Sequence, residues 1–276
     1  MLGNWGIAMQ AECTEVVRSG VRRVVTRALV PEAPVALEYN GLSYAVMMAT
    51  PADLEDFATG FALSEGLAAS AEEVGEVGVT EVEHGWIARA HLAGLGIGKL
   101  SERVRARVAE SSCGLCGIEN LAEVARPLPL VQEHAAIDPA AIFAALDLLH
   151  DRQPLARATG AAHAAAWADA NGTIGWVRED VGRHNAMDKL VGAMALAGAP
   201  LANGFVISTA RCSYEIVEKA VRGGATTLVT VSLPTDLALV RARVAGLSLY
   251  VLARHDSMLW ANEHRFRLGV RGSEVV

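Results

Sequence analysis

The stretch SSCGLCG, residues 111–117, places two cysteines three positions apart among small residues. A pair with this spacing can hold a metal ion, close a redox disulfide, or carry a sulfur atom as a persulfide on one thiolate. Gly114 and Gly117 predict a mobile, exposed loop that admits a bulky partner. The residues alone leave sulfur transfer and disulfide exchange both open.

A zinc site is the less favoured interpretation of Cys113 and Cys116. Structural zinc takes four ligands, so Cys212 and a histidine, or a second copy of the chain, would have to complete the set. Zinc nucleobase deaminases pair such cysteines with His-x-Glu. None of the eight histidines here is followed two residues later by Glu. A thioredoxin-like interpretation is also disfavoured, because no short βαβ unit surrounds the pair.

The composition predicts a globular protein with a small-molecule or protein partner. The chain has 276 residues, is 52% hydrophobic and carries a formal charge of -7. Disorder is therefore not expected, and general nucleic-acid binding is disfavoured. A local basic pocket for a phosphorylated ligand remains compatible with this charge. The length fits two domains or one large α/β unit, and we place a boundary near residue 130, giving parts 1–130 and 131–276.

The N-terminus and the cysteine usage predict a cytoplasmic protein. The first residues, MLGNWGIAMQAEC, lack a basic start followed by a clean apolar stretch, so no secretory signal is expected. Four unevenly spaced cysteines do not form a secreted disulfide scaffold. The uncharged run Leu190–Ile207 is interrupted by Pro200 and Gly204, which predicts a helix end, a loop and a buried strand rather than a membrane span.

The first half of the chain predicts an α+β part. Residues 35–48 form two strand-like runs around Asn40-Gly41, a dipeptide typical of a type I′ hairpin turn. Thr50 is expected to cap the helix that follows and Gly66 to end it. Residues 71–100 resemble strands with glycine turns, and Asp138-Pro139 is expected to open a further helix.

The second half alternates strands and helices. A hairpin is expected around Asn171-Gly172, followed by a helix over 185–198 with Asn185 as its cap, and then by the βαβ pattern of a parallel layer. Ligands in such sheets gather at the carboxyl ends of the strands. The candidate site loops are therefore Ser208–Arg211, Ser232–Thr235 and Leu252–Ser257.

Five segments of the chain, in order between Val35 and Ser257, resemble the formate dehydrogenase accessory sulfurtransferases, the FdhD family. They are PVALEYNGLSYAVMMATPADLEDFATGFALSEGL, SSCGLCG, TGAAHAAAWADANGTIGWVREDVGRHNAMDKLVG, STARCSYEIVEKA and SLPTDLALVRARVAGLSLYVLARHD. The resemblance implies an α/β fold with a cytidine deaminase-like mixed or parallel sheet layer and helices, plus an N-terminal α+β hairpin-and-helix subdomain. It also implies a homodimer.

The resemblance further implies a sulfur carrier. Such a protein takes a persulfide sulfur from a cysteine desulfurase and passes it to the molybdenum cofactor, molybdenum bis(molybdopterin guanine dinucleotide), of formate dehydrogenase. Cys113 would carry the persulfide and Cys116 would assist it. No permanently bound metal, nucleic acid or membrane is expected as a partner.

The cofactor-binding residues implied by the resemblance follow the last predicted parallel strand. They are Leu252, Ala253, Arg254, His255, Asp256 and Ser257. The guanidinium of Arg254 suits a phosphate or a guanine edge. Leu252, His255 and Ser257 stand where the family usually has an aromatic residue, a glycine and a base.

Weaker candidates lie in two other segments. Arg183 and His184 precede a predicted helix whose free amides favour an anion. Arg211 follows a strand and would contact a phosphate or pair with Glu215.

Several polar residues are expected to be structural. Cys212 is predicted to be a packed thiol and His163 a satisfied strand histidine. The carboxylates in LEDF (54–57) and VRED (177–180) are expected on solvated faces. The tail 258–276 has no assigned role.

Two alternatives to the sulfur carrier remain open. One is a molybdenum cofactor-binding chaperone with no obligatory persulfide chemistry, and the other is a zinc-stabilised structural protein, which would lose its fold in a chelator.

Overall fold

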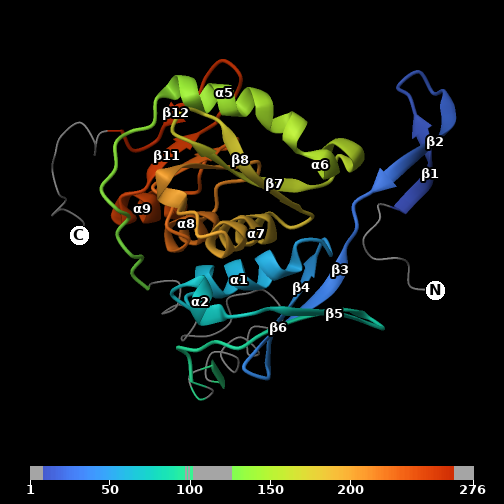
Figure 1. Ribbon diagram of the computed structural model, residues 1–276. Coiled ribbons are helices and arrows are strands. Elements are labelled where there is room, and N and C mark those ends of the chain that lie inside the picture. Colours follow the sequence, from blue (N-terminus) through green and yellow to red (C-terminus); the bar gives the residue numbers. More distant parts are fainter. Residues whose placement is uncertain (1–8, 97, 99, 102–125, 264–276) are drawn as a thin grey trace.

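The computed structural model describes residues 9–96, 98, 100–101 and 126–263 (Figure 1). The cysteine pair Cys113-Cys116 and the end of the tail, residues 264–276, lie outside the described residues.

The N-terminal half contains the predicted hairpin. Strands β3 (Ala33–Tyr39) and β4 (Leu42–Ala49) pair antiparallel, and Asn40 and Gly41 have φ angles of 52° and 78°, as a type I′ turn requires. The hairpin joins β5 (Gly78–Val82) and β6 (Gly85–Ala90) in a sheet of order β4-β3-β6-β5. A short helix, α2 (Ala71–Val74), precedes β5.

Helix α1 (Leu54–Ser64) covers one face of this four-stranded sheet. Alternate residues of β3, including Tyr39, are fully buried there and pack with Phe57 and Phe61. The helix ends as predicted near Gly66, whose φ of 65° lets the Leu67 amide donate to the Ala62 carbonyl at 2.8 Å.

The C-terminal half is built on a six-stranded sheet of order β12-β11-β10-β9-β7-β8. The hairpin around Gly172 and the parallel layer of β9, β10 and β11 are confirmed. The strands are β7 (His163–Asp169), β8 (Ile174–Asp180), β9 (Gly204–Ser208), β10 (Thr227–Thr230), β11 (Ser248–Val251) and β12 (Leu259–Trp260). The mixed α/β class is thus confirmed, and the cytidine deaminase-like detail stays a prediction.

Helices cover both faces of this sheet (Figure 1). Helices α7 (Arg183–Leu196), α8 (Tyr214–Arg222) and α9 (Asp236–Ala245) lie on the face toward α1. Helices α5 (Pro139–Leu149) and α6 (Pro154–Thr159) lie on the other, with a 3-10 turn at His150–Arg152 between them. Asp138 caps α5 as expected, because its Oδ1 accepts from the Ala140 amide at 2.9 Å.

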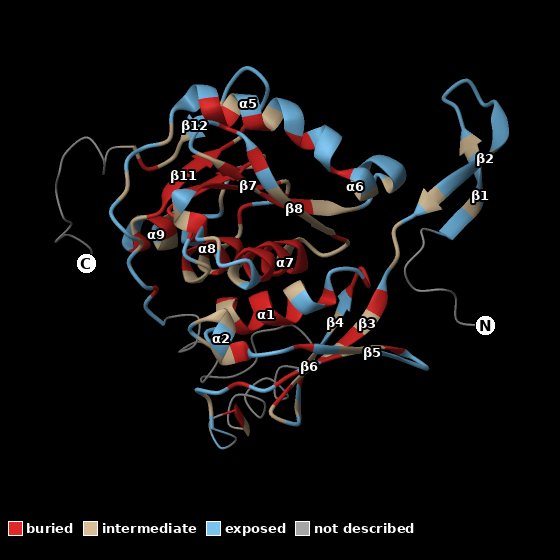
Figure 2. Cartoon of the chain, viewed as in Figure 1, coloured by how far each residue is buried: buried red, intermediate tan, exposed pale blue. Residues whose placement is uncertain are grey.

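The two halves meet where α1 crosses α7, and both helices are largely buried (Figure 2). Two glycines allow the backbones to touch. A Cβ atom at Gly60 would lie 1.7 Å from the Asp188 carbonyl oxygen, and one at Gly192 would lie 1.9 Å from the Asp56 carbonyl oxygen. Neither position can take a side chain without separating the helices.

Two predicted helix caps are wrong. Helix α1 begins after Asp53, which has a left-handed φ of 52°, and not after Thr50. Helix α7 begins at Arg183 with Gly182 as the N-cap, so Asn185 lies inside its first turn. The Thr50 hydroxyl accepts from the Val181 amide, and the Asn185 side-chain amide donates to Asp180. Both side chains therefore belong to a buried polar network and do not cap a helix.

An N-terminal hairpin was not predicted. Strands β1 (Met9–Val16) and β2 (Arg22–Leu29) form a separate two-stranded ribbon that projects from the body (Figure 1). Its residues are mostly exposed, so it lacks the clean alternation of buried and exposed side chains that marks a packed strand.

The uncharged run Leu190–Ile207 has the predicted form. It contains the end of α7, a 3-10 turn at Leu201–Asn203 and most of the buried strand β9. Within the described ranges, no helix has the length and apolar character needed to cross a membrane.

Candidate functional site

The three predicted site loops lie together at the carboxyl ends of the parallel strands. The loop after β9 joins the loop after β10 through a bridge between Cys212 and Pro234, and the Thr235 amide donates to the Cys212 carbonyl at 3.0 Å. The loop after β10 joins the loop after β11, because the Leu252 amide lies 3.4 Å from the Ser232 carbonyl oxygen. The rule that ligands gather at the carboxyl ends of parallel strands therefore selected three loops that form one continuous edge of the sheet.

The loop Leu252–Ser257 leaves β11 through a constrained backbone. Leu252 has a φ of 49°, a left-handed conformation that costs energy for a residue with a branched side chain. Ala253 is buried, and its amide donates to the Thr230 carbonyl at 3.1 Å. The Arg254 amide donates to the Ser257 carbonyl at 2.8 Å, which closes a tight turn.

This turn directs a set of polar side chains to solvent. Arg254, His255, Asp256 and Ser257 are exposed. The Nδ1 atom of His255 lies 3.1 Å from Oδ1 of Asp147 on α5, so this side chain contacts α5 from the turn. Arg254 is exposed and has no ion pair among the described residues.

The segment GRHN places the start of α7 beside the start of α8. The Nε2 atom of His184 lies 3.0 Å from Oε2 of Glu215, the second residue of α8. This contact with His184 lowers the pKa of the Glu215 carboxyl, and the nearby charges of Arg183 and Lys219 lower it further. The two helix N-termini and Arg183 thus concentrate positive potential in one place.

Three buried polar atoms at this place have no hydrogen-bond partner of good geometry within the described ranges. They are Nε of Arg183, Oγ of Ser213, which is the N-cap of α8, and Nε2 of His184, whose contact with Glu215 is an ion pair. His163 lies nearby, and its pKa is lowered, first by burial and then by the charge of Arg183. It is partly buried and begins β7, so its predicted place in a strand is confirmed.

Arg211 and Cys212 follow β9, and the structure gives these two neighbours different environments. Arg211 is exposed, and Glu215, its expected partner, pairs with His184 instead. Cys212 is fully buried, and burial raises the pKa of its thiol to about 11. The prediction of a packed thiol at Cys212 is therefore confirmed. Its burial and raised pKa also disfavour the reactive thiolate.

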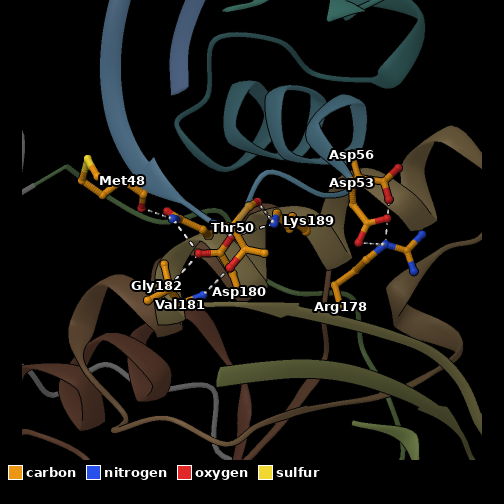
Figure 3. A network of polar contacts seen from close by, with 10 residues as sticks. Met48, Thr50, Asp53, Asp56, Arg178, Asp180, Val181, Gly182 and Lys189 are labelled. Carbon is orange, nitrogen blue, oxygen red and sulfur yellow. Dashed lines mark hydrogen bonds and ion pairs between the residues drawn. The ribbon is translucent and has the colours of Figure 1, made fainter. Parts of the chain in front are cut away.

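A buried polar network holds the turn that leads into Arg183 (Figure 3). Oδ1 of Asp180 accepts from the Gly182 amide at 2.7 Å and from the side-chain amide of Asn185 at 2.9 Å. Oδ2 of Asp180 accepts from the Thr50 amide at 3.0 Å and pairs with Nζ of Lys189 at 2.6 Å. The β4–α1 connection and the start of α7 are thereby fixed to each other.

The expectation that the VRED and LEDF carboxylates are solvated is wrong in three of the cases that the structure describes. Asp180 is fully buried, and the Glu179 carboxylate accepts from the Leu155 and Ala156 amides at the start of α6. Asp56 pairs with Nε of Arg178 at 2.7 Å across the two halves (Figure 3). Glu179 is held by backbone amides, and Arg178 lies 122 residues from Asp56, so no local sequence signal indicated these partners.

A second buried pair joins α1, α7 and α8. Nζ of Lys219 lies 2.9 Å from Oδ1 of Asp188, which also accepts from the Ser64 hydroxyl at 2.6 Å. Burial acts to lower the pKa of Lys219, but Asp188 and Glu65 outweigh it and the pKa is raised. This lysine is therefore a charged structural element.

No cluster of histidine, cysteine or carboxylate side chains suited to a metal ion occurs in the part of the chain that the structure describes.

Comparisons with known proteins identify the family. The sequence model of the FdhD/NarQ family matches residues 30–267, and the chain belongs to this family. The chain is 44% identical over 258 residues to a protein of Xanthomonas euvesicatoria pv. vesicatoria (strain 85-10) named "Sulfur carrier protein FdhD", covering 93% of this chain and 92% of that one. A Bordetella petrii protein of the same name is 40% identical over 255 residues, covering 91% of this chain and 92% of its own.

The fold is similar to that of one solved protein in particular. The crystal structure of a putative formate dehydrogenase accessory protein from Desulfotalea psychrophila superposes with a TM-score of 0.72 at 24% sequence identity, covering 93% of this chain and 97% of that one. At this sequence identity, the structural similarity supports the fold only.

Proposed function

We propose that this protein is a sulfur carrier for formate dehydrogenase. Membership of the FdhD/NarQ family over residues 30–267 is the observation that carries the proposal, together with the printed names of the relatives. The close pair Cys113 and Cys116 supplies the chemistry. Cys212 is buried with a raised thiol pKa, so it does not compete for this role.

The sulfur step is a thiolate exchange. The Cys113 thiolate attacks the terminal sulfur of the donor persulfide on a cysteine desulfurase. The donor S–S bond breaks, the desulfurase leaves as a thiolate, and Cys113 holds the persulfide. Attack of the Cys116 thiolate on the Sγ atom of Cys113 then expels hydrosulfide toward the acceptor and leaves a Cys113–Cys116 disulfide. A dithiol reductant restores both thiols.

The acceptor in this proposal is the molybdenum of the bis(molybdopterin guanine dinucleotide) cofactor. Leu252, Ala253, Arg254, His255, Asp256 and Ser257 form the binding turn. Arg254 is exposed at the end of β11 and can contact a phosphate or a guanine edge. Arg183, His184 and Arg211 are the further candidates, and the free amides at the starts of α7 and α8 would favour the diphosphates.

The same proposal places the protein in the cytoplasm with its desulfurase and with formate dehydrogenase before the cofactor is inserted. We also infer a homodimer from the resemblance to the family.

Activation of formate dehydrogenase in cells tests the function. Cells lacking their own accessory protein would be supplied with this chain, with C113S or with C13S, and formate oxidation would be assayed. Cys13 is an exposed thiol on β1, which makes it the matched control. We expect activity with the parent chain and C13S and none with C113S. Full activity with C113S at equal expression would overturn the proposal.

A further inference from the structure

Strands β1 and β2 form a ribbon that the proposed function leaves without a role. The two strands pair with each other and with no other strand of the described chain, so each keeps one open edge of backbone N–H and C=O groups. Open strand edges are sites where a protein can add an extended segment of a partner. Figure 1 shows the ribbon projecting from the body beyond α6.

The surface at the tip of the ribbon is apolar. Val16, Val17, Val21 and Val24 are 60%, 43%, 57% and 71% exposed. The Val17 amide donates to the Val21 carbonyl at 2.9 Å and closes the turn between the strands. Val16 lies opposite Arg22 in the ladder, so Val16, Arg22 and Val24 share one face of the ribbon. Four exposed valines so close together form the kind of apolar surface that marks an interaction site.

Two arginines beside these valines keep their charges free. Arg23 and Arg27 both pair with Glu15 on the other face of the ribbon. Arg18 and Arg22 are exposed and have no ion pair among the residues that the structure describes. The ribbon contains four arginines and two glutamates, so it is positive on a chain with a net charge of -7. The four valines together with Arg18 and Arg22 are called the ribbon tip.

The base of the ribbon lies beside the turn that presents Arg183 and His184. Strand β2 contacts α6, and the first amides of α6 donate to the Glu179 carboxylate, four residues before Arg183. Strand β3 follows the ribbon and pairs with β4, whose Met48 carbonyl accepts from the Asn185 side chain in the first turn of α7 at 2.8 Å. A protein docked along the ribbon is therefore held on the side of the molecule where α7 begins.

We propose that the ribbon is a docking site for formate dehydrogenase, and that its tip binds an acidic segment with apolar side chains on the surface of that enzyme. The choice of partner rests on the proposed function, because the protein that receives the cofactor must approach the turn with Arg183 and His184. The free charges of Arg18 and Arg22 select an acidic surface. A second copy docked tip to tip brings like charges together, and the acidic remainder of the chain repels a nucleic acid.

Binding of formate dehydrogenase produced without its cofactor tests the proposal. The enzyme would be titrated onto the immobilised full chain and onto the R22E and V24E variants. We expect each substitution to raise the dissociation constant about tenfold. Because the contact includes charges, salt should weaken the complex of the parent chain more steeply than that of R22E.

Two substitutions outside the ribbon are matched controls. Arg243 on α9 is exposed without an ion pair in the described ranges, and Val82 on β5 is 40% exposed. R243E and V82E should bind the enzyme as the parent chain does. Unchanged affinity in R22E and V24E, an equal loss in the controls, or a parent chain that does not bind at about 100 μM, a weak interaction, would overturn the proposal.

Sulfur loading separates this proposal from the proposed function. R22E and V24E should gain sulfur on Cys113 from a cysteine desulfurase as the parent chain does, while they activate formate dehydrogenase less in cells. Absence of sulfur on Cys113 in the parent chain would count against the proposed function. Full activation by both variants with normal sulfur loading would overturn only the docking site. Unchanged circular dichroism and thermal unfolding would show that the variants are folded.

Discussion

Nζ of Lys189 lies 2.6 Å from Oδ2 of Asp180, and neither side chain reaches solvent. The lysine comes from α7 and the carboxylate from the end of β8, while the Lys189 ammonium also donates to the Thr50 carbonyl at 2.9 Å. One buried charge pair therefore joins the N-terminal half to the turn that presents Arg183 and His184. The position of the candidate anion-binding residues depends on this pair.

Removing the lysine should destabilise the whole chain. In K189M the Asp180 carboxylate stays buried without its counter-charge, and we expect a loss of about 3–5 kcal/mol in the free energy of unfolding. Urea denaturation measures it. The double variant D180N/K189M removes both charges and should recover part of the loss. A change below about 1 kcal/mol in K189M, the size of a surface pair, would show that the pair is not structural.

The crossing of α1 and α7 should not tolerate a methyl group. G60A would place Cβ 1.7 Å from the Asp188 carbonyl oxygen, and G192A would place it 1.9 Å from the Asp56 carbonyl oxygen. Because the obstacle is backbone, we expect a destabilisation of about 3 kcal/mol or more, at the upper end of overpacking effects. G96A is the control, since a Cβ there meets nothing within 4 Å. Equal stability of G60A and G96A would contradict the observed approach of the helices.

Stability should fall in mild acid, partly through His163. Burial and the charges of Arg183 and His184 lower its pKa from 6.5, against the opposing effect of Asp180. The unfolded chain therefore takes up the proton first as the pH falls. The contribution of His163 to stability is complete above 6.5 and is lost as the pH drops through that value toward the lowered one. Denaturation of the parent chain and H163Q between pH 5 and 8 should show a shallower dependence in H163Q. Parallel curves would exclude this role.

Nucleotide binding should depend on Arg254. A charge-assisted bidentate contact from this exposed guanidinium is expected to be worth about a tenfold change in affinity, or ~1.4 kcal/mol. Calorimetry with GDP would compare R254A with R22A, an equally charged change on the exposed strand β2. Weaker binding in R254A alone is expected. Equal affinities of R254A and R22A for GDP would show that Arg254 does not bind the nucleotide.

Local sequence signals predicted much of the fold. Asn40-Gly41 and Asn171-Gly172 predicted two hairpins of the body, β3–β4 and β7–β8, because positive φ angles at a tight turn restrict the residue types. The apolar runs of β9, β10 and β11 predicted the parallel layer, and the strand-end rule then brought its three loops to one edge.

Local sequence signals did not predict the long-range polar contacts. Thr50 has the type and spacing of a helix cap, but its hydroxyl accepts from the Val181 amide, 131 residues away, at 3.1 Å. Asn185 likewise bonds to Met48 and Asp180. Local propensity cannot indicate which distant backbone will use a side chain. The β1–β2 ribbon was missed for another reason, since exposed strands carry little hydrophobic periodicity.

The central claim is that Cys113 carries sulfur. The purified chain would be incubated with a cysteine desulfurase and L-cysteine, and the peptide that contains Cys113 and Cys116 would be weighed by mass spectrometry, with C113A as the control. The account predicts a cyanide-labile gain of one sulfur on Cys113 that is absent in C113A. A protein that gains no sulfur but still binds the cofactor would contradict it and favour a cofactor chaperone.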